Sequence, residues 1–360
     1  MKMSKTIAFI GPLPPPVGGV ALANIRVQHI VKQNHPNYTI LNYNTSKGGD
    51  RADLYKKKGL KELSHFLSNI FGVLKFIAKN KIDVSNIFVV PNISFIREAL
   101  LILFLKTTTK KLVIHLHAKT EGDFFLNGIK LKLFTKILSL GDVIFVLSEN
   151  YHKKFYAQYI KPEKLVVLEN FIDYKEFEND IEQKSNDFLY VGRLSEKKGF
   201  YTLVKALALH KNEFKSLKIH VLGEFENETF EQKIISLIEK HSIENFIFYG
   251  SKTGYEKNEL FKKCAVFIFP SYFENSPIVL KEAIAAKMAI ISSDIQENKN
   301  ILDPFDNKLF FETKNENDLA AKMKVLIESP QKVKKMMTAS EHIKDFNFET
   351  ASEIIEKYLY

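Results

Sequence analysis

Two glutamates eight positions apart, Glu274 and Glu282, lie in the segment FIFPSYFENSPIVLKEAIAAK at residues 267–287. An apolar run predicts a strand before the polar loop, and Ser276-Pro277 precedes a stretch of helical periodicity, with serine a favoured N-cap and proline favoured at the first helical position. Glu274 should therefore lie just before a helix and Glu282 about one and a half turns inside it. Because a helix N-terminus attracts anions, a carboxylate on each side predicts a ligand with central phosphates and hydroxyl groups at both ends. A nucleotide sugar has this layout; the alternative is two surface glutamates beside an ordinary helix cap.

A basic turn offers partners for such phosphates. In FLYVGRLSEKKGF, residues 188–200, an apolar strand ends at Val191, Gly192 provides a turn, and Arg193 and Lys198 follow before a predicted helix. A guanidinium group is a bidentate fork and an ammonium group a point charge, and both suit a diphosphate. Their spacing across the turn lets them converge on one site. The alternative is a solvated basic loop.

Two further motifs follow predicted strands in the first half of the chain. GPLPPPVGGV, residues 11–20, places Gly18 and Gly19 before a helix, where glycine lets the backbone approach a phosphate; the alternative is a turn that needs positive φ. In VIHLHAKT, residues 113–120, His115 and His117 share one face of a strand. His117 is nearer the strand end, where a neutral imidazole can hydrogen-bond a sugar hydroxyl or stabilise developing charge, whereas His115 is expected in the core. A metal held by this pair is disfavoured, because no third ligand stands nearby in the sequence.

Composition narrows the class of protein. A chain of 360 residues fits two domains, and its 45% hydrophobic and 26% charged content is ordinary for a soluble globular protein. Cys264 is the only cysteine, which excludes a disulfide framework or a cysteine zinc site and favours a reducing compartment. The N-terminal apolar run is too short for a signal peptide, and Ala99–Leu105 is too short to span a bilayer.

The net charge of +10 is unevenly distributed. Residues 1–180 carry 26 Lys and Arg against 15 Asp and Glu, and residues 181–360 carry 26 against 27, so the first half is at +11 and the second at −1. A basic surface attracts phosphates, nucleic acid or anionic lipid. The alternative is a set of solvated lysines without a partner.

Strand candidates alternate with helix candidates along both halves of the chain. The expected strands are Thr6–Ile10, Thr39–Tyr43, Ile87–Val90, Leu112–Leu116, Val143–Leu147 and Leu165–Leu168, then Phe188–Val191, Leu217–Leu222, Phe246–Tyr249, Val266–Phe269, Ala289–Ser292 and Leu309–Phe311. This alternation, with nearly continuous apolar strands, predicts an α/β protein of two Rossmann-like domains that face each other across a cleft. In open α/β sheets, ligands bind beyond the carboxyl ends of the strands, where all four motifs fall. We expect the N-terminal domain at residues 1–178 and the C-terminal domain at 179–345, with their boundary near the polar stretch Asp173–Asp187.

These motifs together resemble the retaining glycosyltransferases of family 4, and the resemblance covers nearly the whole chain. Its specific parts are VGRLSEKKGF, which is similar to the family's Gly-Arg-Leu…Lys-Gly segment, and the Glu-x7-Glu motif ENSPIVLKE; GPLPPPVGGV looks like bacterial members that build surface polysaccharides. The resemblance implies a GT-B fold in which a C-terminal helix, residues 346–360, packs back on the N-terminal domain. The chain departs from the family after Glu274, after His117 and at Ala286-Lys287, and the first two departures leave the donor sugar open.

The resemblance also implies a role for each motif. Arg193 and Lys198 would hold the donor diphosphate, Glu282 would bind the ribose hydroxyls, and Glu274 and His117 would be the catalytic groups near the reacting sugar. The remaining donor-binding residues would lie against the sugar and phosphates; these are Gly18, Gly19, Asn275, Ser276, Pro277, Ile278 and Val279.

The activity expected from this resemblance is a retaining hexosyl transfer in the synthesis of capsule, O-antigen, lipopolysaccharide or exopolysaccharide. The donor is expected to be a UDP-sugar and the acceptor a saccharide or lipid-diphosphate-linked saccharide. No cofactor and no metal are expected, because the sequence contains no Asp-x-Asp tripeptide and two fixed cations can serve the diphosphate instead. The alternatives are a GT-B sugar-nucleotide epimerase or phosphorylase, or a non-catalytic nucleotide-sugar-binding partner of another transferase.

The protein is expected in the cytoplasm or peripherally on the inner face of the cytoplasmic membrane. Its basic N-terminal half would meet an anionic membrane surface, and the segment Leu60–Lys81 has apolar residues at helical spacing with flanking lysines, as in helices that lie on membranes. The alternative is a helix that packs its apolar side on a sheet. A nucleic-acid partner is not expected, because the carboxylates at the strand ends would repel a phosphate backbone.

Overall fold

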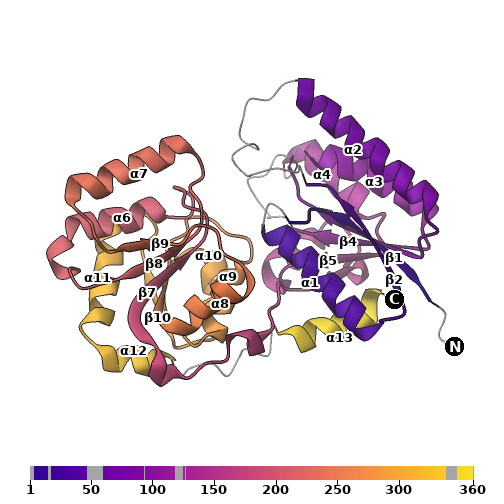
Figure 1. Cartoon of the computed structure of the whole chain (residues 1–360). Coiled ribbons are helices and arrows are strands. Elements are labelled where there is room, and N and C mark those ends of the chain that lie inside the picture. The colour runs from indigo at the N-terminus through magenta and orange to yellow at the C-terminus, as the bar shows by residue number, and fades with distance from the viewer. Residues whose placement is uncertain are drawn as a thin grey trace. The chain divides into compact units, whose positions relative to one another are not determined.

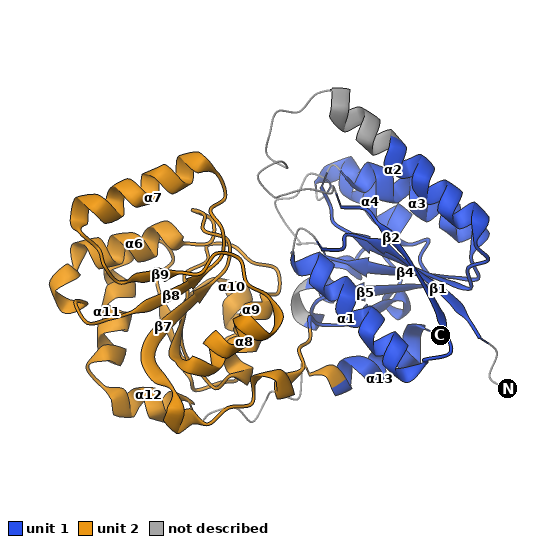
Figure 2. Cartoon of the chain, viewed as in Figure 1, with its two compact units in different colours: residues 1–170, 349–360 blue, residues 171–348 orange. Residues whose placement is uncertain are grey.

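The structure is a computed structural model that describes residues 4–14, 18–46, 60–92, 94–117, 125, 127–337 and 347–359, with only the backbone of 60–67, 150 and 151 (Figure 1). The chain forms two compact units (Figure 2). Unit 1 comprises Met1–Asn170 and Glu349–Tyr360, and unit 2 comprises Phe171–Phe348. The division after Asn170 falls eight residues before the boundary expected from the sequence. The second division, after Phe348, places nearly all of the last helix in unit 1.

Unit 1 is built on a parallel six-stranded sheet of order β2-β1-β3-β4-β5-β6. Its strands are β1 (Thr6–Gly11), β2 (Thr39–Asn44), β3 (Val84–Val89), β4 (Lys111–Leu116), β5 (Val143–Val146) and β6 (Leu165–Val167). Its helices are α1 (Gly19–Asn34), α2 (Leu60–Lys79), α3 (Phe95–Thr108), α4 (Gly128–Leu138), α5 (Lys154–Tyr156) and α13 (Phe348–Leu359), with a π-helical turn at Glu149–Lys153. Side chains of α2, α3 and α4 pack on one face of the sheet in a continuous apolar core.

Helix α13 is held on α1 by polar contacts within unit 1. The Asn34 amide donates hydrogen bonds to Ser352 Oγ at 2.8 Å and to Glu356 Oε1 at 3.0 Å. His35 Nε2 lies 2.9 Å from the same carboxylate oxygen. These contacts join residues more than 300 positions apart, so the end of the chain forms part of the unit that contains its beginning.

Unit 2 repeats the architecture with a parallel sheet of order β12-β11-β10-β7-β8-β9. Its strands are β7 (Ser185–Val191), β8 (Ile219–Leu222), β9 (Phe246–Phe248), β10 (Cys264–Phe269), β11 (Ala289–Ser293) and β12 (Lys308–Phe311). Its helices are α6 (Phe200–Leu209), α7 (Glu228–His241), α8 (Gly254–Lys263), α9 (Ile278–Ala285), α10 (Gln296–Leu302), α11 (Glu316–Ile327) and α12 (Pro330–Met337).

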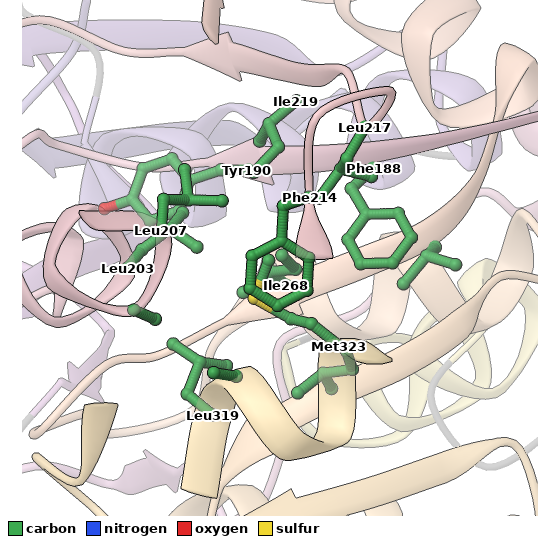
Figure 3. Packing of buried hydrophobic residues seen from close by; sticks show 14 of the residues in the cluster. Phe188, Tyr190, Leu203, Leu207, Phe214, Leu217, Ile219, Ile268, Leu319 and Met323 are labelled. Carbon is green, nitrogen blue, oxygen red and sulfur yellow. The ribbon is translucent and has the colours of Figure 1, made fainter. Parts of the chain in front are cut away.

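The core of unit 2 lies between its sheet and the helices α6 and α11. Figure 3 shows Phe188 and Tyr190 of β7 together with Leu203 of α6 and Met323 of α11. Central strands of this kind are apolar on both faces because helices cover both sides of a parallel sheet. All six residues of β10 are buried, which explains why CAVFIF reads as a continuous apolar run.

Three of the four motifs, all but the histidine motif after β4, follow a strand beside the point where the order of strands across the sheet changes direction. In unit 2 the chain runs outward from β7 to β8 and β9 and then returns to add β10 on the other side of β7. The loops after β7 and β10 therefore leave the same edge of the sheet in opposite directions, which is where open α/β sheets bind ligands. In unit 1 the corresponding point lies between β1 and β3.

Candidate functional site

The loop after β7 carries Arg193 and Lys198, and its backbone contacts the hydroxyl group of a buried tyrosine. The Tyr190 hydroxyl lies 2.9 Å from the carbonyl oxygen of Arg193 and 3.3 Å from that of Lys198, so one side chain bonds both ends of the loop. Burial, with a smaller contribution from the negative charge of Glu274, raises the pKa of Tyr190 well above its ordinary value. The tyrosine therefore remains a neutral hydrogen-bond donor.

Gly199 joins this loop to the loop after β10. It caps the N-terminus of α6 with φ of +70°, and a Cβ at this position would lie 1.8 Å from the carbonyl oxygen of Pro270. One backbone hydrogen bond joins the two loops, since Tyr272 N donates to Lys197 O at 2.9 Å. The side chain of Ser293, at the end of β11, also holds the loop after β10, because its Oγ donates to Ser271 O at 2.5 Å. Only glycine fits such a close approach in a left-handed conformation.

The junction brings two of the predicted site residues into direct contact. Lys198 Nζ lies 2.5 Å from Glu274 Oε1, although 76 positions separate the two residues. Glu274 is buried and Lys198 is about one-third exposed. The sequence had assigned these groups to the diphosphate and to the sugar separately; the structure shows that they form one ion pair. Arg193 lies on the same loop, with Nη1 3.8 Å from Glu226 Oε1.

Helix α9 begins one residue later than the sequence indicated. Pro277 is the N-cap residue, with extended backbone, and the helix starts at Ile278, so the expectation of Ser276 as N-cap and Pro277 as first helical residue is wrong. Pro277 lacks an N–H group and its fixed φ also suits the cap position. The N–H groups of the first helical turn still point out of the helix N-terminus. Val279 is half-buried beside them.

Asn275 supplies an unused acceptor next to Glu274. Its Oδ1 atom is buried, and no hydrogen-bond partner for it lies among the described residues. Buried amide oxygens are nearly always hydrogen-bonded, so this atom is a candidate contact for a donor hydroxyl group. The position matches the departure from the family pattern after Glu274.

Glu282 lies inside α9 and is almost completely buried. Lys257 of α8 places Nζ 2.6 Å from Glu282 Oε1 and lies near the rings of Phe177 and Phe261. Lys257 was not among the residues predicted from the sequence. No local signal could have found it, because the contact depends on α8 and α9 packing on the same face of the sheet.

In unit 1 the glycine pair lies where the chain leaves β1. Gly18 is the N-cap of α1 with φ of −150°, and α1 begins at Gly19. Neither glycine has positive φ, so the alternative of a turn that requires it is wrong. No described atom lies within 4 Å of the place where a Cβ of residue 19 would stand. The protein itself therefore leaves room for a side chain, which is consistent with a ligand that needs close backbone approach.

His117 follows β4 at the same edge of the sheet of unit 1. Its backbone N–H donates to Val89 O at 2.9 Å, and its ring stacks on Phe88 at 5.8 Å. Burial, with a smaller contribution from repulsion by His152, lowers the pKa of His117 to about 4. The imidazole is therefore neutral near pH 7. His115 lies in the core as expected, stacked on Phe88 with Nε2 3.0 Å from Asn86 Oδ1.

The predicted residues thus fall into two groups. Arg193, Lys198, Glu274, the segment 275–279 and Glu282 occupy adjacent loops and one helix of unit 2, whereas Gly18, Gly19 and His117 lie at the carboxyl edge of the sheet of unit 1. Among the described residues, no three His, Cys, Asp or Glu side chains form a cluster suited to a metal ion. Within the same residues, no helix has the length and apolar character needed to cross a bilayer.

Residues 171–342 match the family model described as glycosyl transferases group 1. The matched segment lies within unit 2 and makes up slightly less than half of the chain. Unit 2 is therefore similar to the glycosyltransferases of this group, which supports the prediction of a transferase for this part of the chain. The motifs at residues 188–200 and 267–287 both lie inside it.

Curated relatives match over part of their length. N-acetylgalactosamine-N,N'-diacetylbacillosaminyl-diphospho-undecaprenol 4-alpha-N-acetylgalactosaminyltransferase of Campylobacter jejuni is 30% identical over 176 residues, 47% of this chain and 46% of the relative. The capsular polysaccharide biosynthesis glycosyltransferase CapH of Staphylococcus aureus is 24% identical over 247 residues, 67% of each chain. These two matches span about half to two thirds of the relatives' length.

The crystal structure of HepE from Anabaena in complex with UDP-glucose is similar to nearly the whole chain. Its TM-score is 0.74 at 16% identity, over 98% of both chains. Together with the two parallel six-stranded sheets, this similarity confirms the predicted GT-B fold. The arrangement of the two domains across a cleft stays a prediction.

Proposed function

We propose that this chain, whose residues 171–342 match the model of the glycosyl transferases group 1, is a retaining family 4 enzyme that transfers a hexosyl group from a UDP-sugar to a saccharide or lipid-linked saccharide. The observation that carries this proposal is the Lys198–Glu274 contact of 2.5 Å between the loops after β7 and β10. The proposal is supported because a cation suited to phosphate and a carboxylate suited to sugar hydroxyls meet beside the point where open α/β sheets bind nucleotides.

Charge stabilisation at the leaving group is the main contribution of unit 2. When the bond between sugar and diphosphate breaks, the diphosphate gains negative charge. Arg193, Lys198 and the N–H groups at the N-terminus of α9 are fixed donors that can stabilise this charge without reorganisation. Glu282, in the same helix, is assigned to the ribose hydroxyls. Asn275, Ser276, Pro277, Ile278 and Val279 complete the donor pocket around the sugar.

The sugar end of the reaction is assigned to Glu274 and His117. A neutral imidazole can accept or donate one hydrogen bond to a hydroxyl group without adding charge, and the lowered pKa of His117 keeps it in that form. Gly18 and Gly19 are assigned to the phosphates, because the open space at residue 19 permits close approach. Retention of the anomeric configuration rests on the family resemblance.

The choice of UDP is supported by the similarity to HepE, whose crystal structure contains UDP-glucose. Thermal unfolding with UDP-, GDP-, ADP- and CMP-sugars tests it, because a ligand that binds only the folded state raises the melting temperature. A rise with UDP-sugars, and release of UDP on addition of acceptor, supports the proposal. Formation of an isomerised sugar nucleotide without acceptor would instead identify an epimerase. Turnover that depends on phosphate would identify a phosphorylase, and binding without turnover would identify a non-catalytic partner.

Metal independence follows from the same charges. Arg193 and Lys198 supply the positive charge that a divalent cation supplies in other sugar transferases. Turnover is expected to be unchanged in EDTA. Loss of turnover in EDTA and its return with manganese would show that the diphosphate needs a metal and that these two residues have been misassigned.

The acceptor is proposed to be a lipid-diphosphate-linked saccharide in capsule, O-antigen, lipopolysaccharide or exopolysaccharide synthesis. The support is the names of the relatives, which include a diphospho-undecaprenol glycosyltransferase and a capsular polysaccharide glycosyltransferase, and the charge of +11 in residues 1–180. The reaction is placed at the inner face of the cytoplasmic membrane, with the protein bound peripherally. Transfer of labelled sugar to extracted polyprenyl-diphosphate saccharides, but not to free lipid, tests this assignment.

A further inference from the structure

Three helices of unit 1 form a layer on one face of its sheet. Helices α2, α3 and α4 connect strands that follow one another in the same direction across the sheet, and right-handed crossovers place such helices on one face. Figure 2 shows the three helices together on that side. Helix α3 contacts both α2 and α4 and so lies between them. Val73, Leu101 and Phe134 turn one side of each helix into the core.

The outer side of this layer is also apolar. Ile96, Leu100 and Leu103 lie at helical spacing along α3, and each is about half exposed. Phe71 of α2 and Ile129 and Leu133 of α4 are exposed as well, and Ile129 is 85% exposed. We call Phe71, Ile96, Leu100, Leu103, Ile129 and Leu133 the apolar face. A surface helix ordinarily shows polar residues opposite its buried stripe, and exposed apolar residues that gather on neighbouring helices indicate an interaction surface.

Two of the helices that carry the apolar face also carry exposed lysines. Lys130, Lys132 and Lys136 are exposed on α4, which carries no acidic residue, and Lys75 and Lys79 are exposed on the described part of α2. The one acidic residue of α3, Glu98, is buried and paired with Arg97. Long lysine side chains beside apolar residues can place their ammonium groups at the level of lipid phosphates.

We propose that the apolar face of α2, α3 and α4 binds an anionic lipid membrane. The apolar side chains would enter the boundary between headgroups and acyl chains, and the lysines would contact the headgroup phosphates. A second copy of the chain is a poorer occupant, because self-association would bring two lysine-rich surfaces together and like charges oppose association. The purpose of the contact rests on the proposed lipid-linked acceptor.

The residues proposed to meet the membrane differ from those expected from the sequence. The sequence pointed to the apolar residues of Leu60–Lys81, of which Phe66 lies outside the described side chains. Val73 and Ile77 of that helix are buried against the sheet, so this part of its apolar side belongs to the core. The exposed stripe of α3 was not apparent from the sequence, because a helix that is apolar on both sides is read as a buried one.

Vesicle flotation of the full chain tests the proposal. The wild type is compared with the double variant Leu100→Gln/Leu103→Gln, since glutamine keeps helix propensity and removes the apolar contact. Leu209→Gln is the matched control, because Leu209 is a similarly exposed leucine on α6 of unit 2. Vesicles of phosphatidylcholine with phosphatidylglycerol are compared with phosphatidylcholine alone, at low and high salt. Melting temperature and UDP-dependent stabilisation check that each variant is folded.

The wild type and Leu209→Gln are expected to float with the anionic vesicles at low salt. The partition coefficient of the double variant is expected to be at least roughly tenfold lower. Equal flotation of the double variant, or no flotation of the wild type, would overturn the proposal. So would a dimer without vesicles that the double variant converts to a monomer, because the face would then join two copies. Release of UDP from a UDP-sugar with a soluble acceptor reports on the proposed function separately.

Discussion

At the scale of single residues, the ion pair of Lys198 and Glu274 holds the ammonium group and the carboxylate group at one place in the site. The ammonium group fixes one carboxylate oxygen at 2.5 Å, and Tyr190 fixes the backbone on both sides of the loop that carries Lys198. A group that acts on a developing charge is effective when it is already in place. The ammonium group of Lys198 is held in place by the carboxylate of Glu274, and the loop that carries it is held by the buried hydroxyl group of Tyr190.

Substitution of Lys198 should reduce turnover. Lys198→Met removes the cation while keeping a chain of similar length, and kcat is expected to fall by roughly 100-fold or more, as when one donor to a developing anion is lost. The matched control is Lys197→Met, because Lys197 is the adjacent, exposed lysine. Its kcat should change by less than about twofold, as is usual for an exposed position. Equal effects of the two variants would show that the loop is only a basic surface.

The two glutamates should have different kinetic effects. Glu274→Gln keeps the shape of the side chain near the sugar but removes its charge, so kcat is expected to fall by roughly 100-fold with KM little changed. Glu282→Gln should instead raise KM for the donor. Steady-state kinetics of both variants, with melting temperatures to check folding, distinguishes these effects. Equal and mild changes would return both residues to a structural role.

His117 should make stability depend on pH. Its pKa is about 4 in the folded protein and about 6.5 in an unfolded chain, so the unfolded state takes up a proton first as pH falls from 6.5 to 4. The contribution of neutral His117 to the free energy of unfolding is complete above about pH 6.5 and is lost as pH falls towards 4. Between pH 7 and 5 this amounts to about 2 kcal/mol.

The measurement is urea unfolding of the wild type and His117→Gln at pH 7 and pH 5. The variant should lose less free energy of unfolding between the two pH values, by about 2 kcal/mol. His115 is present in both proteins, and burial, more than repulsion by His117, is the cause of its own lowered pKa, so most of its contribution cancels. An identical pH dependence in the two proteins would mean that His117 is not held neutral by burial.

At the scale of elements, the close approach of the loops after β7 and β10 depends on Gly199. Gly199→Ala would place a Cβ 1.8 Å from Pro270 O at a φ of +70°, so a loss of stability of about 2 kcal/mol or more is expected. Gly19→Ala is the matched test, because no described atom lies near its Cβ and alanine favours a helix. Gly19→Ala should keep the melting temperature but weaken donor binding. A stable Gly199→Ala protein, or unaltered donor binding in Gly19→Ala, would contradict the respective role.

Much of this element structure was predictable from the sequence, and the exceptions have physical causes. All twelve expected strands are present, because buried parallel strands read as short apolar runs between turn residues. Helices α10 (QENKNIL) and α12 (PQKVKKMM) were missed, since each is short and offers few apolar residues in a helical pattern. Lys257 and the pairing of Lys198 with Glu274 depend on where β10 enters the sheet, which local patterns do not reveal.

At the scale of the whole molecule, the division into two units sharpens the charge asymmetry. Unit 1 carries 26 Lys and Arg against 14 Asp and Glu, and unit 2 carries 26 against 28, so their charges are +12 and −2. The donor motifs of unit 2 use a few placed cations, whereas unit 1 carries an excess spread over its surface. Surface charge of this kind acts over a Debye length, whereas a buried ion pair is screened much less.

Salt should therefore affect a membrane-borne acceptor and a soluble acceptor differently. Raising sodium chloride from 50 to 500 mM is expected to raise KM for a lipid-linked acceptor presented in anionic vesicles, because screening weakens attraction between unit 1 and the membrane. The KM for the same saccharide on a short soluble carrier should change little, since Lys198 and Glu274 interact at contact distance. The measurement is KM for each acceptor at both salt concentrations, with neutral vesicles as the control. Equal sensitivity of the soluble and vesicle-borne acceptors would place the effect at the donor site, and the excess charge of unit 1 would then have no part in acceptor capture.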